Sequence, residues 1–233
     1  LKLPLRGADP LGYTMGLPDG RKASFAPGQP QRLFQRLDQE CRLNRKKLKG
    51  RSPGWVTVHQ KNGGLDVAVR HFWQQWPQAI SITSEGLVEV ELFPSLEKDE
   101  YKGQKPWHKY YYLFEGQKYR IKTGMAKRFE VWFRFRGYGK NNGFEFAQAV
   151  AEPALAIVPP SYQIGTGAWG PSVPAGIERF RQMDQAISNV FRLHLAAREA
   201  KGEYGLLNWG DWFGERTYNW GNCEYDLPWA ALQ

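Results

Sequence analysis

The chain has 233 residues, of which 42% are hydrophobic and 24% charged, which is the composition of a globular protein and excludes a largely disordered one. No apolar run reaches the roughly 18 to 20 residues of a membrane-spanning helix, and the N-terminus has no basic-then-apolar signal pattern. Lys and Arg exceed Asp and Glu by 32 to 23, a net charge of +9 that favours encounter with a polyanion.

Residues 1–27 give no pattern that assigns them to a domain. From residue 28 to 151 the apolar residues form short alternating runs, at 54–59, 65–73, 87–93 and 127–136, which are typical of strands. Turn signals such as Asn62-Gly-Gly64 and Glu85-Gly86 separate these runs. The pattern predicts an antiparallel β-sandwich domain over residues 28–151.

The densest basic cluster is the run RLNRKKLKGR at residues 42–51. It carries no recognisable nucleic-acid motif, so we interpret it as the solvated tip of a hairpin and expect no nucleic-acid partner. An anionic polysaccharide suits the same net charge. Cys41 and Cys223 lie far apart in the sequence and outside any CxxC pair, so we expect two free thiols and no zinc site.

Residues 152–176 are rich in Pro and Gly, which predicts an irregular linker between two domains. From Ile177 the apolar residues follow helical spacing until Lys201-Gly202, which predicts one amphipathic helix of about 25 residues. Its apolar face needs partners that residues 202–233 cannot supply. We therefore expect a helical domain, residues 177–233, that continues in a longer parent protein.

Aromatic, carboxylate, amide and arginine side chains are concentrated near the end of the chain, in the run NWGDWFGERTYNWGNCEYD at residues 208–226. Indole rings pack on the C–H faces of sugars while neighbouring polar side chains bind the hydroxyl groups. The residues that fit this description are Trp209, Asp211, Trp212, Asn219, Trp220 and Asn222. Alternatively, the Trp residues pack a helix-to-helix loop against the sandwich. The density of polar partners favours a binding site.

Charged residues complete this loop. The guanidinium fork of Arg216 can bind a carboxylate bidentately, or it can pair with Glu224 or Asp226 within the loop. Asp226 either binds substrate or stabilises the start of a helix. Asp211, Glu224 and Asp226 either bind sugar hydroxyl groups or, as three hard oxygen donors, hold a Ca²⁺ ion; no other cofactor is predicted. His108, beside Trp107, either faces the cleft or has a structural role.

Three motifs together resemble a known family. They are Gly210-Asp-Trp-Phe-Gly-Glu-Arg216, the block Asn219 to Pro228 with the pattern NWGN-x-EYD-x-P, and Val69-Arg-His-Phe-Trp-Gln-Gln-Trp-Pro77. The chain resembles the exo-acting rhamnogalacturonan lyases of the YetA-like group, polysaccharide lyase family 26. These proteins have an N-terminal β-barrel, a central β-sandwich and a C-terminal α/α toroid.

The resemblance covers about residues 28–233 and implies a multidomain β-then-α fold, in which an antiparallel β-sandwich precedes the first helices of a truncated α/α toroid. It also implies a substrate, the pectic polysaccharide rhamnogalacturonan of plant cell walls. Such a substrate favours a secreted or periplasmic protein, although imported oligomers would place the reaction in the cytoplasm.

A lyase that acts on galacturonate must neutralise the carboxylate, remove the C5 proton and assist departure of the C4 oxygen. Arg216, Tyr225 and Glu224 are our candidate catalytic residues, and Tyr225 needs a cationic neighbour to act as a base. Two other functions stay open. A glycoside hydrolase would use Asp211 and Glu224 as acid and base, and a non-catalytic protein would only bind carbohydrate.

Overall fold

The computed structural model describes residues 2–3, 10–102, 114, 116–121, 123–124, 126–137, 143–168, 170–206 and 208. The strands are β1 (Lys2–Leu3), β2 (Pro10–Gly16), β3 (Lys22–Phe25), β4 (Gln31–Leu37), β5 (Glu40–Leu43), β6 (Lys46–Lys49), β7 (Trp55–Gln60), β8 (Gly63–Val69), β9 (Gln78–Ile82), β10 (Val88–Glu91) and β11 (Val131–Arg136). The helices are α1 (Gly143–Ala151), α2 (Pro160–Thr166) and α3 (Arg181–Lys201), with 3-10 turns at Pro18–Gly20 and Glu178–Phe180.

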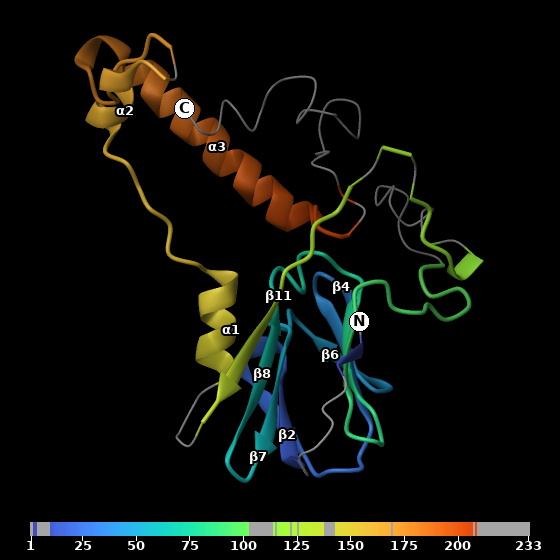
Figure 1. Cartoon of the computed structure of the whole chain (residues 1–233). Coiled ribbons are helices and arrows are strands. Elements are labelled where there is room, and N and C mark those ends of the chain that lie inside the picture. Colours follow the sequence, from blue (N-terminus) through green and yellow to red (C-terminus); the bar gives the residue numbers. More distant parts are fainter. Residues whose placement is uncertain are drawn as a thin grey trace. The chain divides into compact units, whose positions relative to one another are not determined.

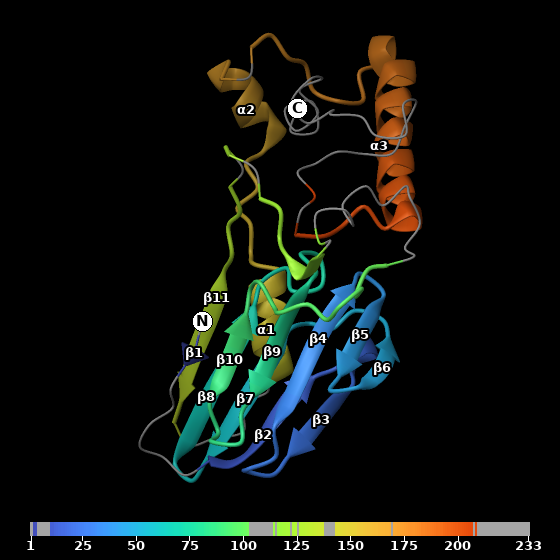
Figure 2. The ribbon, with the colours of Figure 1, turned by 90° about the vertical axis from the view of Figure 1, so that its right-hand side faces the viewer.

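The strands form two antiparallel sheets that face each other (Figures 1 and 2). The first sheet has the order β1-β10-β9-β4-β5-β6, and the second has the order β11-β8-β7-β2-β3. The predicted β-sandwich is therefore confirmed. Residues 10–25, which the sequence leaves unassigned, supply β2 and β3 of the second sheet.

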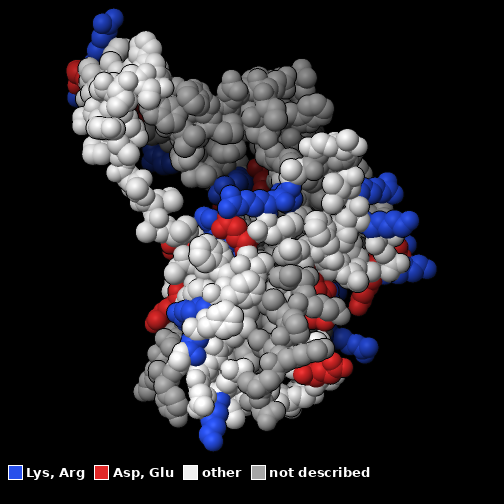
Figure 3. Space-filling view, viewed as in Figure 1, with Lys and Arg blue, Asp and Glu red and all other residues white. Residues whose placement is uncertain are grey.

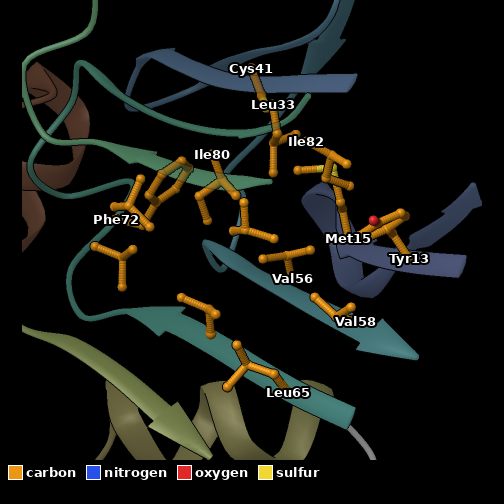
Figure 4. Packing of buried hydrophobic residues seen from close by; sticks show 14 residues of the cluster. Tyr13, Met15, Leu33, Cys41, Val56, Val58, Leu65, Phe72, Ile80 and Ile82 are labelled. Atoms are coloured by element: carbon orange, nitrogen blue, oxygen red, sulfur yellow. The ribbon is translucent and has the colours of Figure 1, made fainter. Parts of the chain in front are cut away.

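The core lies between the two sheets, where every second residue of a strand points inward. Val56 and Val58 of β7 and Ile80 of β9 are among the buried side chains that Figure 4 shows facing one another. Cys41 is also buried there as a free thiol, as predicted, and burial raises its pKa to about 12. Cys223 lies outside the described residues.

The outer face of the second sheet is covered at one end by α1. Ala147 and Val150 of this helix pack on Trp55 of β7 and Ala68 of β8. A Cβ atom on Gly143 would lie 2.3 Å from the Thr57 hydroxyl oxygen, so the close approach of the helix start requires glycine. Our interpretation of this stretch as strand was wrong, because its buried positions recur at helical spacing.

The segment that follows β10 covers the outer face of the first sheet. The Tyr101 hydroxyl donates a hydrogen bond to the carbonyl oxygen of Arg36 at 2.9 Å. The Phe114 ring packs on Tyr101 with 4.9 Å between centroids. The guanidinium of Arg36, itself buried, pairs with the buried carboxylate of Glu100. The charge of Arg36 is thus neutralised beneath the covering segment.

The basic run at 42–51 forms the β5–β6 hairpin, in which Arg45, Lys46, Lys47 and Lys49 are exposed. The prediction of a solvated hairpin tip is confirmed for these residues. Figure 3 shows Lys and Arg side chains spread over the visible face of the β-sandwich, several of them beside Asp or Glu. The net charge of the chain is therefore not gathered in one patch on that face.

The chain divides into two compact units, residues 1–153 with 204–207 and residues 154–203 with 208–233. In the second unit the predicted helix forms as a 3-10 turn followed by α3, and Gly202 ends it in a left-handed conformation. The prediction that residues 152–176 lack regular structure was wrong for residues 160–166, where Pro160 starts α2. Within the described ranges, no helix is both long and apolar enough for a membrane span.

Candidate functional site

All the residues for which the sequence predicts a catalytic or binding role lie outside the described residues. They are His108, Trp209, Asp211, Trp212, Arg216, Asn219, Trp220, Asn222, Glu224, Tyr225 and Asp226. Their roles therefore stay predictions. The first residue of the loop, Asn208, is described, and its side-chain amide donates a hydrogen bond to the Glu203 carbonyl oxygen at 3.0 Å.

The chain just before this loop is fixed to the sandwich. The Gly205 N–H donates to the Gln74 carbonyl oxygen at 2.8 Å, and the Leu206 N–H donates to that of Trp76 at 2.6 Å. The Leu206 side chain is only 1% exposed. Residues 204–206 thus join the segment 69–77, which carries one of the three motifs of the resemblance, and they lead directly into the other two.

Three side chains stack beside this junction, and we call Arg51, Trp73 and Tyr204 the arginine clamp. The Arg51 guanidinium carbon lies 3.9 Å from the Trp73 ring centroid and 5.4 Å from that of Tyr204. The two rings meet edge to face with centroids 4.8 Å apart. Cation–π and aromatic contacts of this geometry are each favourable by about 0.5 to 1.5 kcal/mol. The clamp therefore adds to the attachment of residue 204.

Gly205 allows the chain to pass close to Trp76. Its φ of +127° is one that L side chains rarely adopt, and a Cβ atom there would lie 3.0 Å from two carbons of the Trp76 indole. Trp76 is itself buried against Tyr101 and Phe114, with centroids 6.0 Å apart in both pairs. The indole has little room to move aside, so the junction requires glycine at position 205.

Sequence reasoning missed Arg51 and Tyr204. Arg51 was grouped with the solvated basic run, yet it follows β6 and its side chain is only 26% exposed. Its guanidinium lies 3.7 Å from the Asp38 carboxylate as well as over the two rings. No local sequence pattern indicates that Arg51 packs on Tyr204, because the two residues lie far apart in the chain. The only signal was the density of aromatic residues in 69–77.

A second polar cluster surrounds Glu130, at the start of β11. The Arg70 guanidinium binds its carboxylate at 3.0 Å, and that of Arg128 lies 3.3 Å away. The hydrogen bond from Arg70 is the main cause of a lowered pKa of Glu130, and the positive charges of Arg70 and Arg128 lower it further. Glu130 therefore stays ionised at neutral pH and is unsuited to accept a proton.

Further along the same face, Asp66 of β8 is 1% exposed and binds three side chains. The Thr57 hydroxyl donates to it at 2.6 Å, Arg134 approaches at 2.7 Å and Arg136 at 3.1 Å. Burial, and then the charge of Arg136, lower the pKa of the neighbouring His59. The buried Asp66 carboxylate is neutralised by two arginines of the neighbouring strand, which marks it as a structural element of the sheet.

A metal site needs several donor side chains in one place. Across the part of the chain that the structure describes, no three His, Cys, Asp or Glu side chains gather closely enough to hold a metal ion. Asp211, Glu224 and Asp226, the candidate Ca²⁺ ligands, lie outside that part. The calcium site therefore stays a prediction.

Sequence comparisons do not assign the chain to a family. No family model matches it, and no curated protein is significantly similar to it. The assignment to the rhamnogalacturonan lyases accordingly stays a proposal, based on the three motifs and on the junction of residues 204–206 with the segment 69–77.

Proposed function

We propose that this chain contains the β-sandwich and the first helices of the α/α toroid of a polysaccharide lyase, which cleaves rhamnogalacturonan by β-elimination at galacturonate. The observation that carries the proposal is the junction of residues 204–206 with the segment 69–77. Backbone hydrogen bonds and a buried leucine there join the motif segment 69–77 to residues 205 and 206, which immediately precede the loop 208–226 in the sequence.

The junction supports the proposal because the chain leaves it only two residues before the loop 208–226. Asn208 follows Leu206 by two residues, and two residues span at most about 7 Å of chain. A loop that must orient Trp, Arg and Tyr side chains around a sugar gains from a rigid support at its start. A loop whose Trp residues only fill space would not need the sharp turn at Gly205 against a buried indole.

The proposed chemistry assigns a role to each candidate residue of the loop. Arg216, with Asn222, neutralises the galacturonate carboxylate, which acidifies the C5 proton. Tyr225 takes that proton, and the positive charge of Arg216 lowers the pKa of its phenol. The C5–H electrons form the new C4–C5 double bond as the C4–O bond breaks, and Glu224 assists departure of the C4 oxygen as a proton donor. The Trp residues, with Asp211, Asn219, Asp226 and His108, bind the neighbouring sugars.

The test is the absorbance of the unsaturated uronyl product. The complete protein that contains this sequence is incubated with rhamnogalacturonan I and, separately, with homogalacturonan, each with and without a calcium chelator. We expect absorbance to rise with the first polymer alone. Arg216→Ala and Tyr225→Phe should abolish the rise while part of the binding is kept, because these groups act mainly in the transition state.

The other functions give different results in the same experiment. New reducing ends without an absorbance change would replace the lyase by a hydrolase, with Asp211 and Glu224 as acid and base. Binding of the polymer with neither signal would indicate a non-catalytic carbohydrate-binding protein. Full turnover by Arg216→Ala, Glu224→Ala and Tyr225→Phe would reject the site assignment.

A further inference from the structure

Strand β11 carries exposed aromatic and basic side chains at the edge of the second sheet. It is the first strand in the order of that sheet and pairs with β8. Glu130, Trp132, Arg134 and Arg136 alternate along the chain, so they lie on the outer face of the sheet. Trp132 is 50% exposed, although it lies directly opposite Ala68 of β8.

Trp132 lies two residues after Glu130 and on the same outer face of the sheet. The Glu130 carboxylate is fixed by the Arg70 guanidinium at 3.0 Å, and the Glu130 backbone accepts a hydrogen bond from the Arg70 N–H at 2.9 Å. A half-exposed indole beside such a fixed ion pair offers a ring face against which a ligand can pack.

Arginines are dense around Trp132. The guanidinium groups of Arg70 and Arg128 both approach the Glu130 carboxylate, and those of Arg134 and Arg136 both approach the Asp66 carboxylate. The Arg128 side chain is 85% exposed, and only one of its guanidinium nitrogens is needed to reach Glu130. Arg128 therefore retains donors for an anionic ligand.

We propose that Trp132 and Arg128 form a binding subsite for a uronate-containing sugar chain on the outer face of β11. The C–H face of one sugar packs on the Trp132 indole, and the carboxylate of a uronate binds the Arg128 guanidinium. The ligand class is that of the proposed lyase substrate, so the choice of a polyuronate depends on the proposed function. The subsite would hold the polymer on the sandwich.

A single-stranded nucleic acid is the other anionic polymer that uses arginine and aromatic rings. It binds by stacking successive bases on successive rings. Phe133 and Phe135 alternate with Trp132 along β11, so their side chains leave the opposite face of the strand. Among the described outer-face positions of β11, the neighbours of Trp132 are Glu130 and Arg134, and neither offers a second ring. One ring with arginines suits an acidic sugar better.

The test measures binding by titration calorimetry of the full chain with polygalacturonate, rhamnogalacturonan I oligomers and neutral galactan. Trp132→Ala should weaken binding of the two acidic ligands about tenfold, and Arg128→Gln about threefold, with the second effect decreasing at high salt. Lys22→Gln is the matched control. Lys22 is exposed on β3 at the opposite edge of the sheet. The binding constants of the Lys22→Gln variant should therefore equal those of the parent protein.

Melting temperatures of the variants separate lost binding from lost folding. Should Trp132→Ala fail to fold, Arg128→Gln decides, because its exposed side chain contributes little to stability. Unchanged binding in both variants, equal binding of neutral galactan by the parent, or tighter binding of oligo(U) RNA than of polygalacturonate would overturn the subsite.

Binding and cleavage are measured in parallel, so the two proposals fail separately. Weaker binding in Trp132→Ala with no unsaturated product from the parent would keep the subsite and reject the lyase. Cleavage by the parent with an unchanged KM in both variants would keep the lyase and reject the subsite.

Discussion

Replacement of Gly205 by Ala should release the segment that leads into the proposed catalytic loop. The present attachment consists of two backbone hydrogen bonds, each favourable by about 1 kcal/mol, and the buried Leu206 side chain, which contributes about 2 kcal/mol. Ala would have to adopt a φ of +127° and place its Cβ 3.0 Å from the Trp76 ring. The strain alone costs about 1 to 3 kcal/mol, a large part of the total.

The expected result is local opening without unfolding of the sandwich. Hydrogen exchange measured by mass spectrometry should show the amides of Gly205 and Leu206 exchanging about 30 to 100 times faster in Gly205→Ala, which corresponds to about 2 to 3 kcal/mol. Peptides from β7 and β8 should keep their protection, since the core between the sheets does not include residues 204–206.

A matched control separates the Trp76 contact from general strain. Gly28 has a φ of +79°, and no atom lies within 4 Å of the place that a Cβ would take, so Gly28→Ala introduces strain without a clash. It should leave exchange at Gly205 and Leu206 unchanged. Unaltered exchange at these two amides in Gly205→Ala would refute the reasoning that the glycine holds the junction.

Two further variants test the charged groups of the sheets. Asp66→Asn should lower the free energy of unfolding by about 3 kcal/mol in urea titrations, because two arginines lose a buried partner. The exposed control is Asp19→Asn, and an equal loss of stability in both variants would contradict this prediction. Glu91 is partly buried, which opposes ionisation, but hydrogen bonds from Arg32 and Ser81 lower its pKa. Its stabilisation is thus present above the unfolded pKa of about 4.3 and is lost as pH falls through the lower folded value. Glu91→Gln should therefore destabilise by about 1 kcal/mol at pH 7 and by progressively less below about pH 4; a constant difference across that range would exclude the mechanism.

Most of the sandwich was predictable because its strands alternate in polarity. The runs at 54–59 and 87–93 correspond to β7 and β10, and the Asn62-Gly-Gly64 turn joins β7 to β8. The strand β2 was missed because Gly12 and Gly16 resemble turn signals and leave only Tyr13 and Met15 as buried hydrophobic side chains. The sequence pattern did not reveal the helix α1, because a helix of about two turns among strands is too short to show a clear helical period of hydrophobic residues.

The candidate site was predictable only where it depends on local sequence. The residue types of the loop 208–226 predict a binding site, whereas the packing of the chain just before it depends on Arg51, Trp73 and Tyr204, which meet through the fold. Pairing between side chains so far apart in the sequence leaves no periodic signal. The exposure of Trp132 was equally hidden, because the alternating pattern of β11 does not tell which face is covered.

The sandwich unit consists of two separate segments of the chain, so it cannot fold completely until the ribosome has made both. The ribosome adds the fifty residues 154–203 after residue 153 and before the segment 204–207, which completes the sandwich unit. At about 5 to 20 residues per second, roughly 3 to 10 seconds pass before Leu206 can reach its place. During this interval the Gln74 and Trp76 carbonyl groups lack their backbone partners. An expression fragment that stops near residue 153 would keep this end of the sandwich permanently uncovered.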